Sequence, residues 1–175
     1  MSAFNERPFT MRFAKMGDEA ERIFELTYPE GFVRFGLNRP PVKMSMLPPK
    51  LRCTPDYLTS KGLVECMGVG RDQTLKLKLS KLDALYDWHQ DFRCDLFLWD
   101  SKKKRYAWVR IPQLIARCGA SDYEIRAFHD GPEYYAIPLA KLPIVDDWVD
   151  YEPPEDEAVD SEPESIGAAA YEGEF

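Results

Sequence analysis

The stretch TPDYLTSKGLVECM, residues 54–67, contains two short apolar runs separated by a polar break that ends in glycine. A break of this composition between runs rich in Tyr, Leu and Val is typical of a β-hairpin. We therefore interpret residues 51–58 and 63–67 as two antiparallel strands and residues 59–62 as the turn between them.

The expected hairpin brings two carboxylates together. Side chains alternate along a strand, so Glu65 and Met67 should point to one face, and Asp56, on the first strand, can lie beside Glu65. Two neighbouring carboxylates repel each other unless a cation lies between them, and Mg²⁺ or Mn²⁺ suits oxygen ligands. The carbonyl of Cys66 could supply a third oxygen and Glu21 a fourth. The sequence thus predicts a divalent metal site.

A helix is expected on each side of this hairpin. Apolar residues recur at helical spacing over residues 18–27, after an acidic first turn. Asp72 has the character of an N-cap, and apolar residues at helical spacing follow it. The sequence therefore predicts a second helix over residues 73–89, which carries Lys76 and Lys78.

The remaining pattern completes an α+β domain. Polar turns between apolar runs indicate hairpins, and proline-rich stretches indicate loops. The further elements expected are a strand over 31–36, a loop over 38–49, a hairpin with arms 94–99 and 106–111, a short helix over 113–117, and a hairpin with arms 124–129 and 133–137. The order α-β-β-β-α-β-β predicts a mixed central sheet with flanking helices in one domain over residues 1–150.

Charge is distributed unevenly along the chain. The formal net charge is −7, but residues 151–175 hold nine acidic residues and no Lys or Arg, which leaves a body of about +2. We expect this tail to be flexible and disordered. It could serve only as a solubilising segment, compete with nucleic acid for basic patches of the body, or dock a protein partner.

Composition limits the cellular context. The apolar runs are far shorter than the roughly 20 residues that cross a bilayer, and the N-terminus lacks the pattern of a secretory signal, so a cytoplasmic location is expected. The four cysteines form no CxxC pair, which argues against structural zinc and favours reduced thiols in the core.

The residues around the acidic pair resemble those of the PD-(D/E)xK nuclease superfamily. The match consists of Pro55-Asp56, then Glu65-x-Met67, then a Gly-x-Gly segment and a lysine-rich stretch, and it extends over roughly residues 12–111. It is closest to the small phage-type resolvase and endonuclease branch. The resemblance implies a restriction-endonuclease-like α/β/α core, with a helix, three strands, a helix and another strand, and with the metal site on the second and third strands.

The resemblance also implies residue roles. Asp56, Glu65 and a helix residue, Glu21, would hold one or two Mg²⁺ ions that activate water for attack on a phosphodiester. The family normally has a lysine where this chain has Met67, and some members carry that lysine on the following helix. Lys76 is then the first candidate for a displaced catalytic lysine.

Lys78 is the second candidate, and Gln73 is a polar neighbour of both. Met67 is open to two other interpretations, an introduced inactivating change or a domain that binds DNA without cutting it.

Residues 102–105 form a basic turn that could grip DNA phosphates together with Lys78; they are Lys102, Lys103, Lys104 and Arg105. Aromatic residues alternate along the hairpin that carries this turn, and we interpret them as core rather than as a surface for base stacking. Enzymes that resolve branched DNA are commonly two-fold dimers, so the resemblance also implies a homodimer.

Three functions are compatible with the sequence. The first is a Mg²⁺-dependent DNA endonuclease of phage DNA metabolism and recombination, such as a Holliday-junction-resolvase-like enzyme acting on duplex or branched DNA in the host cytoplasm. The second is a catalytically inactive module of the same fold that binds DNA or protein. The third is a virion or assembly component unrelated to nucleases, in which Asp56 and Glu65 would lie apart.

Overall fold

The computed structural model describes residues 7–36, 46–129 and 131–153, and their side chains from residue 16 onward. The elements are, in chain order, α1 (Arg7–Thr27), β1 (Phe32–Arg34), α2 (Pro49–Arg52), β2 (Tyr57–Thr59), β3 (Gly62–Val69), β4 (Thr74–Lys78), α3 (Leu79–Asp91), β5 (Cys94–Asp100), β6 (Arg105–Arg110), α4 (Ile111–Gly119), β7 (Glu124–Ala127), β8 (Glu133–Pro138), the 3₁₀-helix η2 (Leu139–Lys141) and β9 (Ile144–Asp150).

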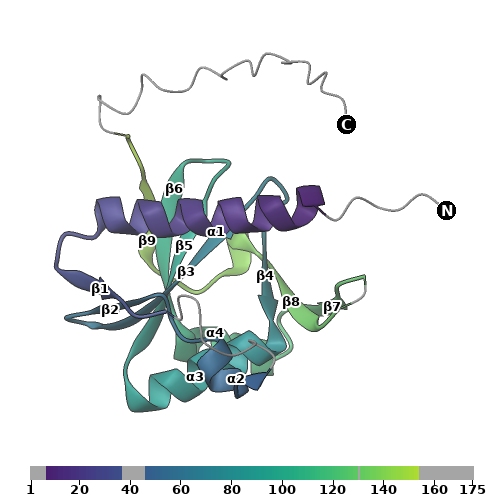
Figure 1. The fold of residues 1–175 in the computed structure, drawn as a ribbon. Coiled ribbons are helices and arrows are strands. Elements are labelled where there is room, and N and C mark those ends of the chain that lie inside the picture. The colour runs from purple at the N-terminus through teal and green to yellow at the C-terminus, as the bar shows by residue number, and fades with distance from the viewer. Residues whose placement is uncertain (1–6, 37–45, 130, 154–175) are drawn as a thin grey trace, which may run out of the picture.

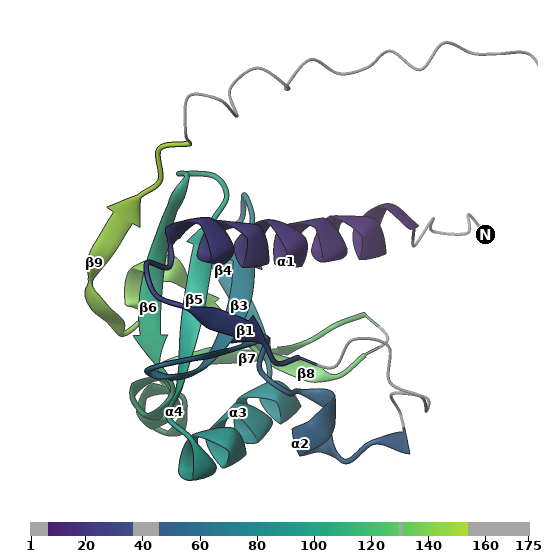
Figure 2. The same ribbon diagram turned by 60° about the vertical axis from the view of Figure 1, so that its left-hand side comes forward.

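The strands form two sheets. The larger sheet has the order β1-β2-β3-β5-β6-β9 and is mixed, because β3 and β5 run parallel while the other pairs are antiparallel. The smaller sheet is antiparallel and has the order β4-β8-β7. Figures 1 and 2 show α1 along one side of the larger sheet and α3 and α4 on the other. The expected α+β class with a mixed central sheet and flanking helices is therefore confirmed.

The contact between α1 and the larger sheet is aromatic. Phe24 of α1 is fully buried, and its ring centroid lies 4.6 Å from that of Tyr57 and 5.4 Å from that of Phe97. Trp99 and Trp108 belong to the same cluster. The interpretation of the hairpin aromatics as core is confirmed for Phe97 and Trp99, whereas Tyr106 and Trp108 are partly buried and pack against this cluster.

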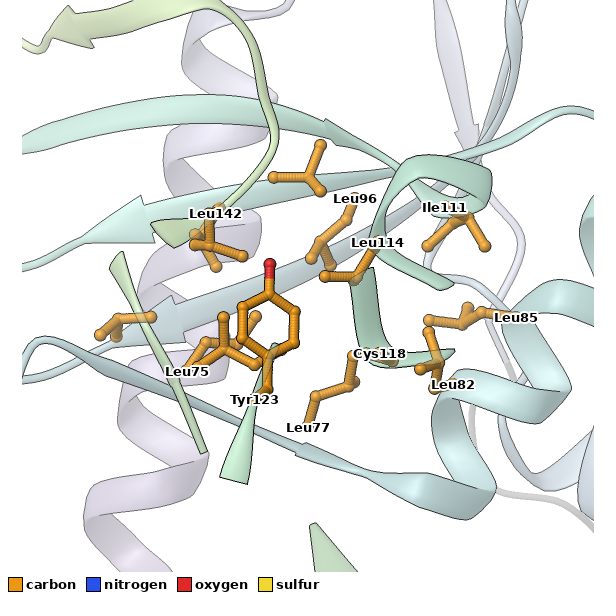
Figure 3. Close-up of a cluster of buried hydrophobic side chains, with 14 of the residues drawn as sticks. Leu75, Leu77, Leu82, Leu85, Leu96, Ile111, Leu114, Cys118, Tyr123 and Leu142 are labelled. Carbon is orange, nitrogen blue, oxygen red and sulfur yellow. The ribbon is translucent and has the colours of Figure 1, made fainter. Parts of the chain in front are cut away.

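The core on the opposite face is mainly aliphatic. Figure 3 shows leucines of β4 and α3 converging with Leu96 of β5 and with residues of α4. Leu96 and Leu98 reach this core because they alternate with Phe97 and Trp99 along β5. The two faces of β5 thus serve two different cores, and all seven of its residues are buried.

Gly68 fixes the distance between α1 and β3. A Cβ atom at this position would collide with the backbone carbonyl of Met16. Only glycine therefore lets the α1 backbone approach β3 this closely. Gly62, the first residue of β3, has a φ of +132°, which side-chain-bearing residues rarely adopt.

Several expected elements have different bounds. The first helix begins at Arg7 rather than at residue 18, and the strand expected over 31–36 is limited to Phe32–Arg34. The first arm of the central hairpin is also shorter, because Pro49–Arg52 form the helical turn α2 and β2 begins only at Tyr57. The proline pair at the start of this segment favours the first turn of a helix.

The helix expected over residues 73–89 is wrong at its start. Residues Thr74–Lys78 form strand β4, which pairs with β8, and the helix α3 begins at Leu79. Leu75 and Leu77 are buried while Lys76 and Lys78 are not, which is the two-residue period of a strand. Lys76 and Lys78 therefore lie on a strand, and Asp72 is not an N-cap.

The later elements agree better with the sequence. The hairpins β5–β6 and β7–β8 are confirmed, and the short helix is α4, somewhat longer than expected. Strand β9 was not expected; it completes the edge of the larger sheet beside β6. The acidic tail lies largely outside the described residues. No described helix is both long and apolar enough to cross a membrane.

Candidate functional site

Asp56 lies at the junction of three strands. It immediately precedes β2, and its carbonyl accepts hydrogen bonds from the backbone amides of Phe35 (2.8 Å) and Gly36 (3.1 Å). Its carboxylate oxygen Oδ2 accepts a hydrogen bond from the backbone N–H of Cys66 in β3, at 2.7 Å. Because β2 begins only at Tyr57, the carboxylate takes the place of a strand partner for β3. The two acidic positions are therefore neighbours, as the hairpin predicted.

Glu65, the residue before Cys66 on β3, is a buried carboxylate. It is 2% exposed and forms an ion pair with Nζ of Lys81, on the first turns of α3. A charge buried in this way needs a partner, since desolvation without one is costly. Lys81 supplies that partner and connects the sheet to the helix.

Burial dominates the electrostatics of this site. Burial is the largest cause that raises the pKa of Glu65; Lys81 opposes the rise and the charge of Asp56 adds to it, and the net pKa is about 7. Burial also raises the pKa of Asp56, against the hydrogen bond from Cys66. Burial lowers the pKa of Lys81, but the charge of Glu65 outweighs this effect, and the net shift is upward. When Asp56 and Glu65 are both ionised, Lys81 balances only one of their two negative charges, in a poorly hydrated place.

Glu21 faces the same region but is engaged elsewhere. Its carboxylate accepts a hydrogen bond from Nη1 of Arg34 at 2.6 Å. Arg34 also donates to Glu25 at 3.0 Å and to the hydroxyl of Tyr57 at 3.1 Å. The charge of Glu21 still contributes to raising the pKa of Glu65. In this structure Glu21 is therefore a charged neighbour of the acidic pair, held by arginine.

Cys66 and Met67 lie on opposite faces of β3. The thiol of Cys66 is buried in the core beneath α1, where burial raises its pKa well above its ordinary value. Met67 packs, partly buried, against the core of the other face, the one that contains α3. Met67 thus lies on the face of Glu65, as expected from the strand period.

Lys76 does not lie with the acidic pair. It is on β4, and its Nζ forms an ion pair with Asp72 at 2.8 Å. Lys78 is exposed at the end of the same strand, with its Nζ 6.0 Å from the ring centroid of Phe128. The displacement from helix to strand removes the reason for choosing Lys76, because the lysine that meets Glu65 is Lys81.

The basic turn between β5 and β6 is held by a buried acid. Asp100 is fully buried and accepts hydrogen bonds from the amides of Lys102 and Lys103 and from Nε of Arg105. Lys104 pairs with Glu19 at 3.0 Å, and the guanidinium of Arg105 stacks 4.3 Å from the ring centroid of Trp148. Lys102 and Lys103 are left exposed to solvent, where their side chains can meet an anion.

The described residues contain no group of three or more His, Cys, Asp or Glu side chains placed to hold a metal ion. Mg²⁺, however, is commonly held by one or two protein carboxylates, with water and substrate phosphates completing its shell. Asp56 and Glu65 fit this smaller requirement, because both have a raised pKa and lie close enough for the charge of Asp56 to raise the pKa of Glu65. A cation between them would relieve that crowding.

Lys81 is the residue of this site that the sequence did not single out, although it falls within the stretch expected to form the second helix. Its distinguishing signal is the period: Lys76 and Lys78 alternate with buried leucines as a strand requires, whereas Lys81 precedes Leu82 and Leu85 at helical spacing.

Comparison with known proteins finds no family model that matches this chain, no similar curated protein and no similar solved structure.

Proposed function

We propose that this protein is a Mg²⁺-dependent endonuclease that hydrolyses DNA phosphodiesters, with Asp56, Glu65 and Lys81 as its catalytic residues. One observation supports this above the others: the ion pair of Glu65 with Lys81, beside the carboxylate of Asp56. Two crowded carboxylates and one lysine are the functional groups that metal-dependent phosphodiester hydrolysis uses.

Each residue has a role that follows from its chemistry. When bound, Mg²⁺ would lower the pKa of a water molecule and polarise a phosphate oxygen. Asp56 and Glu65 would supply the protein oxygens for that ion. Lys81 is held by Glu65 and carries three N–H donors, so it can orient a water molecule and offset negative charge that develops on the phosphate.

Lys81 therefore takes the role that the sequence suggested for Lys76, and the proposed site is complete without a lysine at position 67. Met67 packs with the aliphatic core, and a cation there would be placed among apolar side chains. The basic turn supports a DNA substrate, because Lys102 and Lys103 are exposed and held on a rigid hairpin by Asp100.

The test combines metal binding with cleavage. Titration calorimetry with Mn²⁺ should show binding to the parent protein and to Lys81→Ala, but not to Asp56→Asn combined with Glu65→Gln. On duplex and four-way-junction DNA, Lys81→Ala should lower the cleavage rate by about 10²–10³, the usual cost of one lost electrostatic donor.

Lys76→Ala is the matched control, because it also removes a lysine from an ion pair, the one with Asp72, away from the acidic pair. This variant should cut DNA as the parent does. The proposal fails if the parent cuts none of these substrates with Mg²⁺ or Mn²⁺. It also fails if the double variant binds Mn²⁺ like the parent.

A second candidate is a module that binds DNA or protein without cutting. The observation that favours it is the engagement of the acidic residues: Glu65 is paired with Lys81 and Glu21 with Arg34. In that case DNA binding should be equally strong in EDTA and in Mg²⁺, and the parent should show no cleavage with either metal.

A further inference from the structure

A pocket of about 280 Å³ lies on the α1 face of the larger sheet, beyond the last turn of α1. Its walls come from the end of α1, the turn between β2 and β3, strands β5 and β6, and the start of β9. Val64 lines it, while the next residue, Glu65, points to the opposite face of the sheet. The pocket is therefore separate from the candidate nuclease site.

The polar end of the pocket contains the carboxylate of Asp95, of which only one oxygen has hydrogen-bond partners among the described residues. Oδ2 of Asp95 accepts three hydrogen bonds, from Nε (3.0 Å) and Nη2 (2.9 Å) of Arg93 and from Nη1 of Arg110 (2.6 Å). Oδ1 of Asp95 is buried and has no hydrogen-bond partner among the residues that the structure describes. Buried carboxylate oxygens are rarely left in this state, and Asp95 lines the pocket, so a small shift of its side chain would present this acceptor to a ligand.

The other end of the pocket is aromatic and rigid. Trp108 lies with its ring centroid 5.3 Å from that of Phe97 and 6.1 Å from that of Tyr28, and all three residues line the pocket. The hydroxyl of Tyr28 is a second buried polar group without a partner within the described part of the chain. A flat ring with polar edges would suit this wall, because aromatic side chains offer stacking surface at little entropic cost.

Charge decides which donor the pocket can accept. A cationic ligand would meet Arg93 and Arg110, both of which contact Asp95; Lys61 is already paired with Glu30, and Asp146 is the other carboxylate of the lining. A purely apolar ligand would leave Oδ1 of Asp95 buried and unpaired, which is unfavourable. The favoured donor is therefore a neutral N–H group on an aromatic ring.

We propose that this pocket binds a nucleoside monophosphate, with the base against Trp108 and its N–H groups directed to Oδ1 of Asp95. Arg93 is about half exposed and Arg110 about one third exposed, and each has N–H groups not used on Asp95 that can bind the phosphate. The volume lies just below the usual range of roughly 300–1,000 Å³ for small-molecule sites, which favours a ligand no larger than one nucleotide.

Tryptophan fluorescence and calorimetry in EDTA test the proposal without any contribution from the nuclease site. The probes are the four common nucleoside monophosphates, ribose 5-phosphate, which lacks the base, and guanosine, which lacks the phosphate. Guanosine monophosphate should bind best, since its base presents a ring N–H and an amino group on one edge. Guanosine should bind at least tenfold more weakly, and ribose 5-phosphate should not bind.

Two variants assign the binding to this pocket. Asp95→Asn removes the acceptor charge and should weaken binding at least tenfold; Tyr28→Phe removes only a hydroxyl group and should weaken it several-fold while folding as the parent does. Lys141→Gln, on η2 and outside the pocket lining, is the control for a lost cation and should bind normally. The proposal is overturned if no monophosphate binds at millimolar concentration, or if Tyr28→Phe and a folded Asp95→Asn both bind like the parent.

Discussion

The Glu65–Lys81 ion pair controls how the stability of the protein depends on pH. Burial raises the pKa of Glu65 from 4.5 to about 7, so the folded protein retains a proton there that the unfolded chain loses. The free energy of unfolding should therefore fall as the pH rises from about 4.5 to about 7. Above pH 7 the carboxylate is ionised and paired with Lys81, and this contribution to the slope ends.

Replacing Lys81 with methionine removes the partner of Glu65, so the free energy of unfolding should continue to fall above pH 7. Without the lysine, the buried carboxyl stays protonated to a higher pH, and each further pH unit costs about 1.4 kcal/mol. Parent and Lys81→Met should therefore differ by about 1.4 kcal/mol more at pH 8 than at pH 6, and by about 2.7 kcal/mol more at pH 9. Below pH 6 their pH profiles should be parallel, because Glu65 is protonated in both proteins.

Urea denaturation followed by circular dichroism between pH 5 and pH 9, in EDTA, measures these differences. Lys76→Met is the matched control, since Lys76 forms a partly exposed pair with Asp72, whose loss should cost less than about 1 kcal/mol at every pH. A constant difference between parent and Lys81→Met over the whole range would refute the reasoning. The ion pair would then be no more than a contact of ordinary strength.

Three further outcomes are expected. Gly68→Ala should lower the free energy of unfolding by about 2 kcal/mol, because the new Cβ meets the Met16 carbonyl. Gly17→Ala, within α1 and with open space around it, should instead raise the free energy of unfolding by about 0.5–1 kcal/mol. Urea denaturation compares the two variants. Met67→Lys should lower the midpoint of thermal unfolding without raising cleavage, since it places a cation in the aliphatic core; an increase in cleavage would show that a lysine is missing there. Truncation after Pro153, which removes eight acidic residues, should tighten duplex DNA binding and steepen its salt dependence in filter binding, and unchanged affinity would limit the tail to other roles.

The truncation point in that experiment follows from the structure. Tyr151 donates its backbone N–H to the carbonyl of Lys104 at 2.8 Å, and its ring lies 5.8 Å from that of Trp99. A cut after Asp150 would remove these contacts and alter the core as well as the charge. A cut after Pro153 keeps them.

The central hairpin and the acidic pair were predictable because local chemistry specifies them. The Ser-Lys-Gly turn before Leu63 needs a glycine at positive φ, and the strand period then places Asp56 beside Glu65. The helix expected from residue 73 was wrong because leucines at 75, 77, 79 and 82 satisfy both a strand period and a helical period. Tertiary pairing of β4 with β8 decides between them, and no local signal reports it.

The start of α3 also determines which lysine pairs with Glu65. With the helix starting at residue 73, Lys76 would lie in its first turn, whereas with the helix starting at Leu79 that place belongs to Lys81. The N-cap residue is Lys78, which makes no capping hydrogen bond through its side chain, so the usual sequence mark of a helix start is missing. Strand β9 was missed for a related reason: its residues are half-buried or exposed, and Asp146 interrupts the strand pattern with a positive φ.

The parallel pairing of β3 with β5 has a consequence for how the protein is made. During synthesis β3 leaves the ribosome well before β5, and residues 70–93 must be added before the two strands can meet. Until then one edge of β3 is open, and the neighbouring apolar side chains of Leu63, Val64 and Val69 lack the cover that β5 provides. We therefore expect newly made chains to aggregate through this strand, which also carries Glu65, and slower synthesis over residues 70–93 should lengthen that exposure.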